Sequence, residues 1–242
     1  MKKRFLLTAL SVLGLASVSF AQISFGPKLG VGINKFVDVK TPSDQPSYDY
    51  SYLVVPQIGV VLNAQFGNHF AVRPELLYTQ RGTISKTSAT IFGSSINYEG
   101  RMRISYLELP IKLVGSVHAG PGNVELFAGP SFGYVLGGKS HEEVTGFIND
   151  TRDGKVIGKK QPSDYDASTD DDTYINPLNV SLNFGAGYKF DNGLLIQLGF
   201  NLGLSNLNPH SADSDTEDER NNTIIKSNAF TLGVAYLFGG KK

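Results

Sequence analysis

Apolar and polar residues alternate with a period of two along most of the chain after residue 22. From Ile23 onward the odd positions are apolar as far as Ile33, and the even positions are small or polar. The same alternation recurs in seven more segments, at 52–66, 69–81, 104–117, 124–138, 176–190, 194–206 and 228–238. Such alternation is typical of strands whose two faces meet different surroundings. The pattern therefore predicts eight β-strands.

The connections between these segments alternate in length. Long polar connections lie at 37–51, 82–100, 138–175 and 205–227, and short turns lie at 67–68, 118–123 and 191–193. Strands of about 9–11 residues joined in this rhythm are typical of outer-membrane barrels. Because every backbone polar group in a bilayer must be paired, such a sheet has to close. We therefore predict an all-β fold, an eight-stranded antiparallel transmembrane up-and-down β-barrel with short periplasmic turns and four long external loops.

The two faces of the predicted strands differ in a way that fits a membrane barrel. The apolar face is the more continuous one and would face lipid, while the face of Gly, Ser, Asn, Gln and scattered charge would line the lumen. Aromatic residues at the short-turn ends fit an interfacial girdle, and Tyr78 and Tyr134 lie farther along their strands. Five prolines argue against the prediction, because each removes a ladder hydrogen bond from a strand interior. They are Pro27, Pro56, Pro74, Pro110 and Pro130.

The first 21 residues have the pattern of a secretory signal peptide. Three basic residues precede an apolar run that closes on Ser19, Phe20 and Ala21. A membrane anchor is the alternative, but the run is short for a spanning helix, which needs about 20 apolar residues. We predict a signal peptide at 1–21 and an outer-membrane barrel domain at 22–242.

Composition narrows the function classes. The predicted signal peptide holds three of the 22 basic residues and none of the 22 acidic ones, so the remainder has a net charge of −3. A slightly acidic chain is a poor candidate for nucleic-acid binding. The chain has no cysteine, which excludes a disulfide scaffold and thiolate-based metal or redox chemistry.

Five motifs occur in order along the chain: PELLYTQRG (74–82), YLELPIKL (106–113), AGPSFGYVLGGK (128–139), FGAGYKF (184–190) and NLGLSNL (201–207). With the signal pattern and an aromatic last strand, they resemble the PorT-like outer-membrane β-barrel family of Gram-negative bacteria. The resemblance covers essentially the whole chain after residue 21 and implies an eight-stranded outer-membrane barrel. The family name comes from a member associated with a protein secretion system, although most relatives have no assigned activity. This chain departs from the family at Gly199, where relatives often have an inward-facing Arg.

Charged residues on the polar face form the first candidate site. They are Lys28, Arg73, Glu75, Glu108, Lys112 and Lys189. Because 69–81 and 104–117 are consecutive strands, the four charged residues that they carry are expected to meet. Opposite charges can neutralise each other inside a narrow barrel, and removing one partner there costs about 3–5 kcal/mol. We interpret the group as a structural plug, with a proton or ion path, or a buried carboxylate of raised pKa, as the alternatives.

Two acidic runs, 163–172 and 211–220, lie in predicted loops. The first run offers candidate Ca²⁺ ligands, because closely spaced aspartates supply the oxygen atoms that Ca²⁺ takes. The candidates are Asp164, Asp166, Asp170, Asp171 and Asp172. Neither run has the central Gly of an EF-hand, and a solvated surface loop is the preferred interpretation.

Catalytic motifs give little support to an enzyme. Barrel proteases place Asp and His together at the outer rim, which draws attention to His141 and His210 on predicted loops. No spacing supports such a site, and the sequence has no HExxH motif.

We predict an integral outer-membrane barrel without enzymatic activity or cofactor. It would act as a scaffold that presents external loops, above all 138–175, because function in such folds lies in the loops. The alternatives are a component of a secretion or assembly machinery, and a narrow solute channel, for which eight strands leave no continuous water path. A soluble β-barrel that binds lipid is the rival fold. The expected partners are outer-membrane lipid, the barrel-insertion machinery and an extracellular or secretion-system protein; no nucleic acid is expected, and the protein is expected to be a monomer.

Overall fold

The computed structural model describes residues 22–40, 49–91, 94–146, 149–164, 170–209 and 224–239. The predicted signal peptide lies outside the described residues. All the regular elements within them are strands, namely β1 (Gln22–Lys40), β2 (Asp49–Ser51), β3 (Leu53–Phe66), β4 (Phe70–Ile91), β5 (Ser94–His118), β6 (Gly122–Thr145), β7 (Asp150–Gly158), β8 (Thr173–Ile175), β9 (Leu178–Phe190), β10 (Leu194–Gly203), β11 (Ile224–Tyr236) and β12 (Phe238–Gly239). In the part of the chain that is described, no helix is long and apolar enough to cross a membrane.

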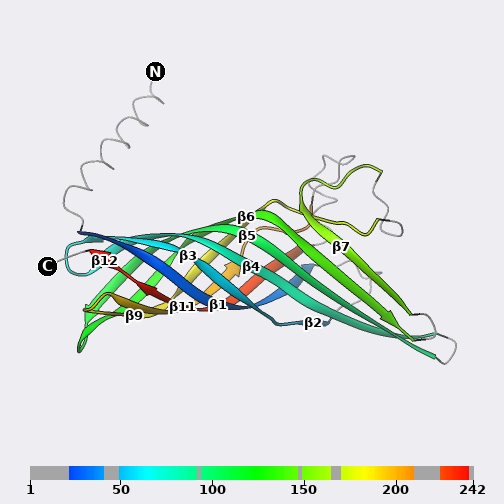
Figure 1. Ribbon diagram of the computed structural model, residues 1–242, viewed down its shortest axis with the longest axis horizontal. Helices are drawn as coiled ribbons and strands as arrows, with labels where there is room; N and C mark the ends of the chain where they lie inside the picture. Colours follow the sequence, from blue (N-terminus) through cyan, green and yellow to red (C-terminus); the bar gives the residue numbers. More distant parts are fainter. Residues whose placement is uncertain are drawn as a thin grey trace, which may run out of the picture.

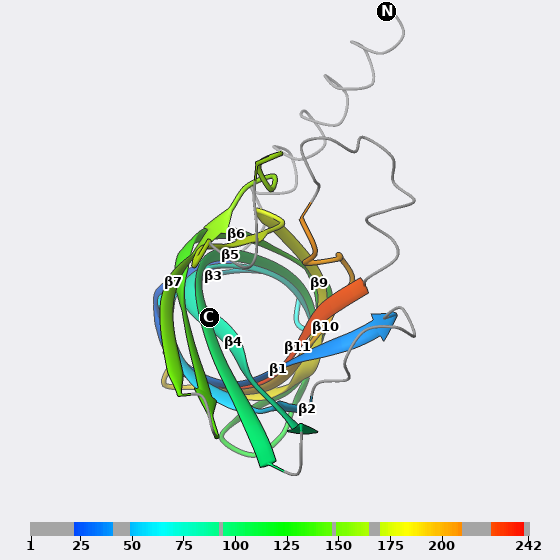
Figure 2. The same cartoon turned by 90° about the vertical axis from the view of Figure 1, so that its right-hand side faces the viewer.

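Eight of these strands close into a ring. Each of β3, β4, β5, β6, β9, β10 and β11 pairs with the next in that order, and β1 joins β11 to β3; all of these pairs are antiparallel. Figure 2 shows the ring from its end. The remaining strands extend the ring: β2 pairs with β4, β7 with β6, β8 with β7, and β12 with the start of β1. The predicted eight-stranded antiparallel barrel is thereby confirmed.

The barrel is apolar outside and polar inside. Large apolar side chains point outward along every strand of the ring, with Leu29, Leu113 and Leu198 each about three-fifths exposed (59%, 65% and 62%). Polar side chains of the opposite parity, such as Asn63 and Gln197, are buried. This distribution is the reverse of that in a water-soluble β-protein, and it is the one expected of a barrel whose wall faces lipid.

The two ends of the barrel differ in the length of their connections. At the short-turn end, the chain reverses at 67–69, 119–121 and 191–193. Gly67 and Gly193 have φ values of +63° and +94°, a conformation that residues with a Cβ rarely adopt. Strand β12 pairs with the start of β1 at this same end (Figure 1).

At the opposite end, which we call the long-hairpin end, the loop boundaries expected at 82–100 and 138–175 are wrong. Strand β4 continues to Ile91, β5 begins at Ser94, β6 continues to Thr145, and β7 returns from Asp150. Figure 1 shows these strands reaching beyond the rest of the barrel. The sequence 83–90 (TISKTSAT) is rich in β-branched residues, which favour strands, but it is polar on both faces. Period-two hydrophobicity cannot detect strands that have no lipid-facing side.

The five in-strand prolines remain within strands, and the ladder is interrupted on one side of each. Pro27 and Pro56 keep regular positions opposite Val60 and Val31. The pairs between β3 and β4 pass over Pro74. Between β5 and β6, Pro110 pairs with Ser131 and the next pair is Leu113 with Ala128, so Pro130 is left unpaired on that side. The missing donors therefore cost local ladder bonds without opening the ring.

Candidate functional site

Three groups of buried charged side chains lie along the lumen. The first, nearest the short-turn end, joins Arg73 of β4 to Glu125 of β6 across the interior. Two parallel contacts connect them, from Nη1 to Oε2 at 2.7 Å and from Nη2 to Oε1 at 2.8 Å. Nε of Arg73 also donates to the Asn63 side-chain oxygen at 2.9 Å. A bidentate, fully buried pair of this kind fixes the two strands relative to each other.

The second group has one carboxylate between two ammonium groups. Glu75 accepts from Lys28 through Oε2 and from Lys112 through Oε1, both at 2.7 Å. Both lysines also donate to the Gln197 side-chain oxygen, at 3.0 Å and 3.4 Å. Nζ of Lys112 lies 4.5 Å from the centre of the Phe127 ring, which adds a cation–π contact. The group therefore carries one more positive than negative charge.

The third group lies farther toward the long-hairpin end. Nη2 of Arg81 donates to Oε1 of Glu108 at 2.8 Å, and the Ser131 hydroxyl donates to the same oxygen at 2.6 Å. The other Glu108 oxygen and the nearby Tyr106 hydroxyl are buried and have no hydrogen-bond partner among the described residues.

Five of the six sequence-predicted lumen residues are buried, and Lys189 is partly buried. The expected meeting of Arg73, Glu75, Glu108 and Lys112 does not occur as one cluster. Arg73 and Lys112 are directly opposite in the β4–β5 register, where like charges repel, so each reaches a different carboxylate. The Arg73 partner, Glu125, was missed by sequence reasoning. Glu125 lies an even number of positions before the inward-facing Gly129 and Ser131, so the period-two pattern places it on the same inward face.

The packing around Gly199 leaves no room for a large side chain. A Cβ built there would lie 2.8 Å from the Thr231 hydroxyl and 3.5 Å from the Phe127 ring, and one built at Gly185 would lie 2.7 Å from the same ring. Phe127 thus occupies the lumen space that an Arg from β10 would need.

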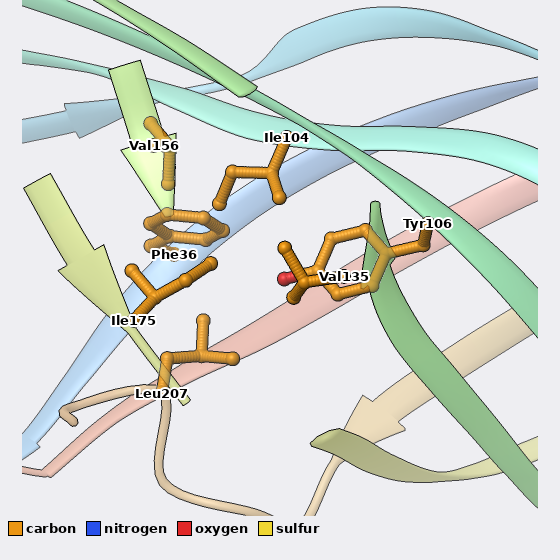
Figure 3. Packing of buried hydrophobic residues seen from close by; sticks show 7 residues of the cluster. All are labelled: Phe36, Ile104, Tyr106, Val135, Val156, Ile175 and Leu207. Carbon is orange, nitrogen blue, oxygen red and sulfur yellow. The ribbon is translucent and has the colours of Figure 1, made fainter. Parts of the chain in front are cut away.

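An apolar cluster crosses the lumen above the charged groups. Its members are Phe36, Ile104, Tyr106, Val135, Val156, Ile175 and Leu207. Figure 3 shows these side chains pointing toward one another from β1, β5, β6, β7, β8 and the segment after β10. Backbone hydrogen bonds hold that last segment in place, from Leu207 N to Ile225 O and from Asn176 N to Leu207 O, both at 2.9 Å. We call this cluster the apolar closure.

Beyond the apolar closure lies a cavity of about 290 Å³, which we call the vestibule. Phe36, Ile175 and Leu207 belong both to its lining and to the closure. The rest of its lining consists of Tyr50, Thr83, Ser85, Tyr98, Gly100, Arg101, Met102, Ser140, Glu142, Thr173, Tyr174, Asn208, Pro209 and Ile225. Mostly apolar and aromatic walls with a few polar groups are typical of ligand sites, and barrel mouths are a common place for them.

The remaining sequence-predicted candidates that the structure describes do not line the vestibule. Among the described residues, no three His, Asp or Glu side chains are grouped to hold a metal ion, and Asp166 lies outside those residues. Asp172 accepts from the backbone N–H of Lys155 at 3.0 Å. His141 lies 2.8 Å from Asp153, but the two side chains are 49% and 80% exposed, unlike the buried carboxylate that orients a catalytic histidine. His210 lies outside the described residues.

Comparisons with known proteins agree with the fold. A family model described as "Outer membrane protein beta-barrel domain" matches residues 20–208. Similar solved structures include Ail, the attachment invasion locus protein of Yersinia pestis (13% identity, 90% of this chain and 99% of that chain, TM-score 0.37), and Neisserial surface protein A (8%, 88% and 97%, TM-score 0.37). Another is the outer membrane protease OmpT from Escherichia coli (12%, 90% and 96%, TM-score 0.28). At these scores the similarities carry no argument about function. A search of curated proteins found no match.

Proposed function

Because the chain belongs to the outer membrane protein β-barrel domain family, we propose that it is a non-enzymatic outer-membrane scaffold that binds a protein partner at its long-hairpin end. In this proposal the short turns are periplasmic and the long hairpins are external, as in other outer-membrane barrels. The barrel anchors the binding surface and carries no solute.

The apolar closure is the observation that carries this proposal. It lies between the charged lumen and the vestibule, and its side chains come from six segments of the chain. An eight-stranded barrel has an interior that side chains can just fill. A barrel with ion pairs in its middle and an apolar layer across its outer end is better suited to holding a rigid external surface than to conducting ions.

The vestibule supports a protein partner that inserts an apolar or aromatic side chain. Its volume of about 290 Å³ is at the small end of ligand sites. Phe36, Met102 and Ile175 offer apolar contact, while Glu142 and Ser140 are polar groups on the same lining. A buried anchor with a polar surround is how protein interfaces gain most of their affinity.

We also propose that the chain is a member of the narrower PorT-like family, which its sequence motifs resemble. All of these motifs lie in or next to the barrel strands, and three of them also contribute to the apolar closure. These are YLELPIKL, AGPSFGYVLGGK and NLGLSNL, through Tyr106, Val135 and Leu207. The motifs therefore support a shared barrel. A role in a secretion or assembly machinery would show itself by a partner at the short-turn end.

Site-specific photo-crosslinking in intact cells tests the proposal. A crosslinking amino acid replaces Tyr98 or Tyr174 in the vestibule, Leu113 on the lipid-facing wall, or His69 at the short-turn end. The two vestibule positions should capture the same protein, and Leu113 should not capture it. Capture from His69 alone would favour the secretion or assembly alternative. A stepwise conductance of the wild-type protein in planar bilayers would instead refute the claim that the lumen is closed.

A further inference from the structure

Three cationic side chains lie side by side on the outer surface of the long hairpins. Arg103 of β5 is directly opposite Lys139 of β6, and Lys139 is directly opposite Lys155 of β7. All three are exposed. Because adjacent strands are about 4.8 Å apart, the row spans about 10 Å. We call it the cationic row.

The cationic row forms no ion pair among the described residues. No ion pair or side-chain hydrogen bond there involves any of its three members. Like charges directly opposite each other destabilise a sheet. Repulsion among the three cations therefore destabilises this part of the sheet, and a bound anion would relieve that repulsion.

Several charges around the cationic row are, in contrast, already engaged. Lys86 lies 2.9 Å from Glu99, and its hydrogen bond lowers the pKa of that carboxyl. Arg101 also approaches Glu99, at 3.6 Å. The acids that share a surface hollow with the row are Asp153, Asp171 and Asp172. Asp153 contacts His141, and Asp172 accepts the backbone N–H of Lys155. Asp171 forms no ion pair within the described ranges, so none of the three acids pairs with a side chain of the row.

The row lies just beyond the apolar wall. Tyr78, Leu107 and Tyr134 are exposed and directly opposite one another in β4, β5 and β6, and Leu136 is the last large apolar residue exposed on β6. Lys139 is three residues farther, about 10 Å along the strand and less along the tilted barrel axis. The headgroup layer on each side of a bilayer is about 5–8 Å thick. The row is therefore at the depth of lipid headgroups.

We propose that Arg103, Lys139 and Lys155 bind the phosphate group of an anionic lipid in the membrane leaflet at the long-hairpin end. Arg offers a planar fork that matches two phosphate oxygens, and each Lys adds a point charge. The lipid chains would lie along the apolar wall below, against Leu107 and Leu136. This site is on the outer surface of the barrel and is separate from the vestibule.

Native mass spectrometry of the full-length protein in detergent tests this site. Phosphatidic acid is the probe, and phosphatidylcholine is the zwitterionic comparison lipid. The Lys139→Gln/Lys155→Gln variant should bind phosphatidic acid roughly 30-fold more weakly than the wild type, since each surface cation contributes about fivefold. The matched control, Lys159→Gln/Lys226→Gln, removes the same charge from lysines outside the row and should bind like the wild type. Heat-modifiable gel mobility verifies that each variant is folded.

Three results would overturn the proposal. Equal loss in the control variant would show a general charge effect and no site. Unchanged phosphatidic acid binding in the Lys139→Gln/Lys155→Gln variant would show that the lipid binds elsewhere. Complete displacement of phosphatidic acid by millimolar inorganic phosphate would assign the row to a soluble anion, because the lipid chains would then add nothing. None of these results bears on partner capture at the vestibule.

Discussion

The group around Glu75 gives the sharpest test of how the lumen is stabilised, because it contains one acid and two bases. Replacing Glu75 by Gln leaves Lys28 and Lys112 facing each other without a carboxylate. Replacing Lys28 by Gln instead leaves an intact Glu75–Lys112 pair at 2.7 Å. Both substitutions change the formal charge by one, but only the first removes the shared partner. The two variants should therefore differ in stability.

The magnitude follows from the distances. At 2.7 Å and an effective dielectric constant of about 20, each Glu75–Lys contact has a gross attraction of about 6 kcal/mol. Much of this is offset by the cost of removing the charges from water. Breaking a buried pair by deleting one partner typically costs about 3–5 kcal/mol, and this is the expected destabilisation by Glu75→Gln. Lys28→Gln should cost less, about 1.5–3 kcal/mol, since it loses the ammonium hydrogen bonds to Glu75 and Gln197 but keeps a neutral pair.

Urea titrations of the refolded barrel in detergent micelles would measure both values. The chain has no Trp, so the transition is best followed by far-ultraviolet circular dichroism and by heat-modifiable gel mobility. Equal destabilisation by the two substitutions would refute the prediction, because the loss of the shared carboxylate would then be no more harmful than the loss of one of its two lysine partners. A Glu75→Gln variant as stable as the wild type would remove the ion-pair interpretation of the lumen altogether.

Substitutions at three other positions test the remaining parts of the interior. Arg73→Ala should destabilise the barrel by about 3–5 kcal/mol in the same urea titration, because it leaves the buried Glu125 without its bidentate partner; no change would contradict that pairing. Gly199→Arg should lower stability by at least about 1–3 kcal/mol through overpacking against Phe127 and Thr231, and the conservative Gly199→Ala should also be destabilising because of its 2.8 Å contact. Phe36→Ala should cost about 3–5 kcal/mol at the apolar closure and speed proteolysis of the long hairpins, while stable bilayer currents in this variant would show that Phe36 alone seals a channel.

The sequence was sufficient to predict the barrel because a lipid-facing wall imposes period two on every strand that crosses it. Leu113 and Lys112 are neighbours in the sequence with opposite surroundings, and parity alone separates them. The period-two pattern could not predict which charges pair, because a side chain in the lumen can contact a residue at the same level along the barrel axis on any other strand. Arg73 illustrates this, since it bonds to Glu125 of β6 although Lys112 of β5 is opposite it in the sheet.

The sequence pattern did not predict the strands beyond the lipid-facing part of the barrel. Beyond Leu136 the sheet continues, but water replaces lipid on its outer face, so hydrophobicity no longer alternates. The parity itself also changes at this point: Tyr134 and Leu136 face outward, and so do Lys139 and His141. A register shift between Ser105 and Tyr106 accommodates one additional residue of β6 at Leu136. This β-bulge directs Lys139 into the cationic row while Ser140 lines the vestibule.

Gly137, next to the bulge, is the residue on which this change of parity depends. Its φ of +136° is a conformation that residues with a Cβ rarely adopt, and a Cβ there would meet nothing nearer than the Val156 carbonyl oxygen at 3.9 Å. Gly137→Ala should therefore cost about 1–3 kcal/mol through backbone strain alone. Gly115→Ala is the matched control, because a Cβ at Gly115 meets nothing within 4 Å.

The strain at Gly137 should act locally, since the ion pairs and the short-turn end are built from other residues. We expect Gly137→Ala to increase hydrogen exchange in 137–145 and in β7, to weaken phosphatidic acid binding at the cationic row, and to leave exchange near Arg73 unchanged. Gly115→Ala should change none of the three. If Gly137→Ala behaved like Gly115→Ala, the bulge would not depend on glycine, and the division between wall and hairpins would have to arise from the loss of lipid contact alone.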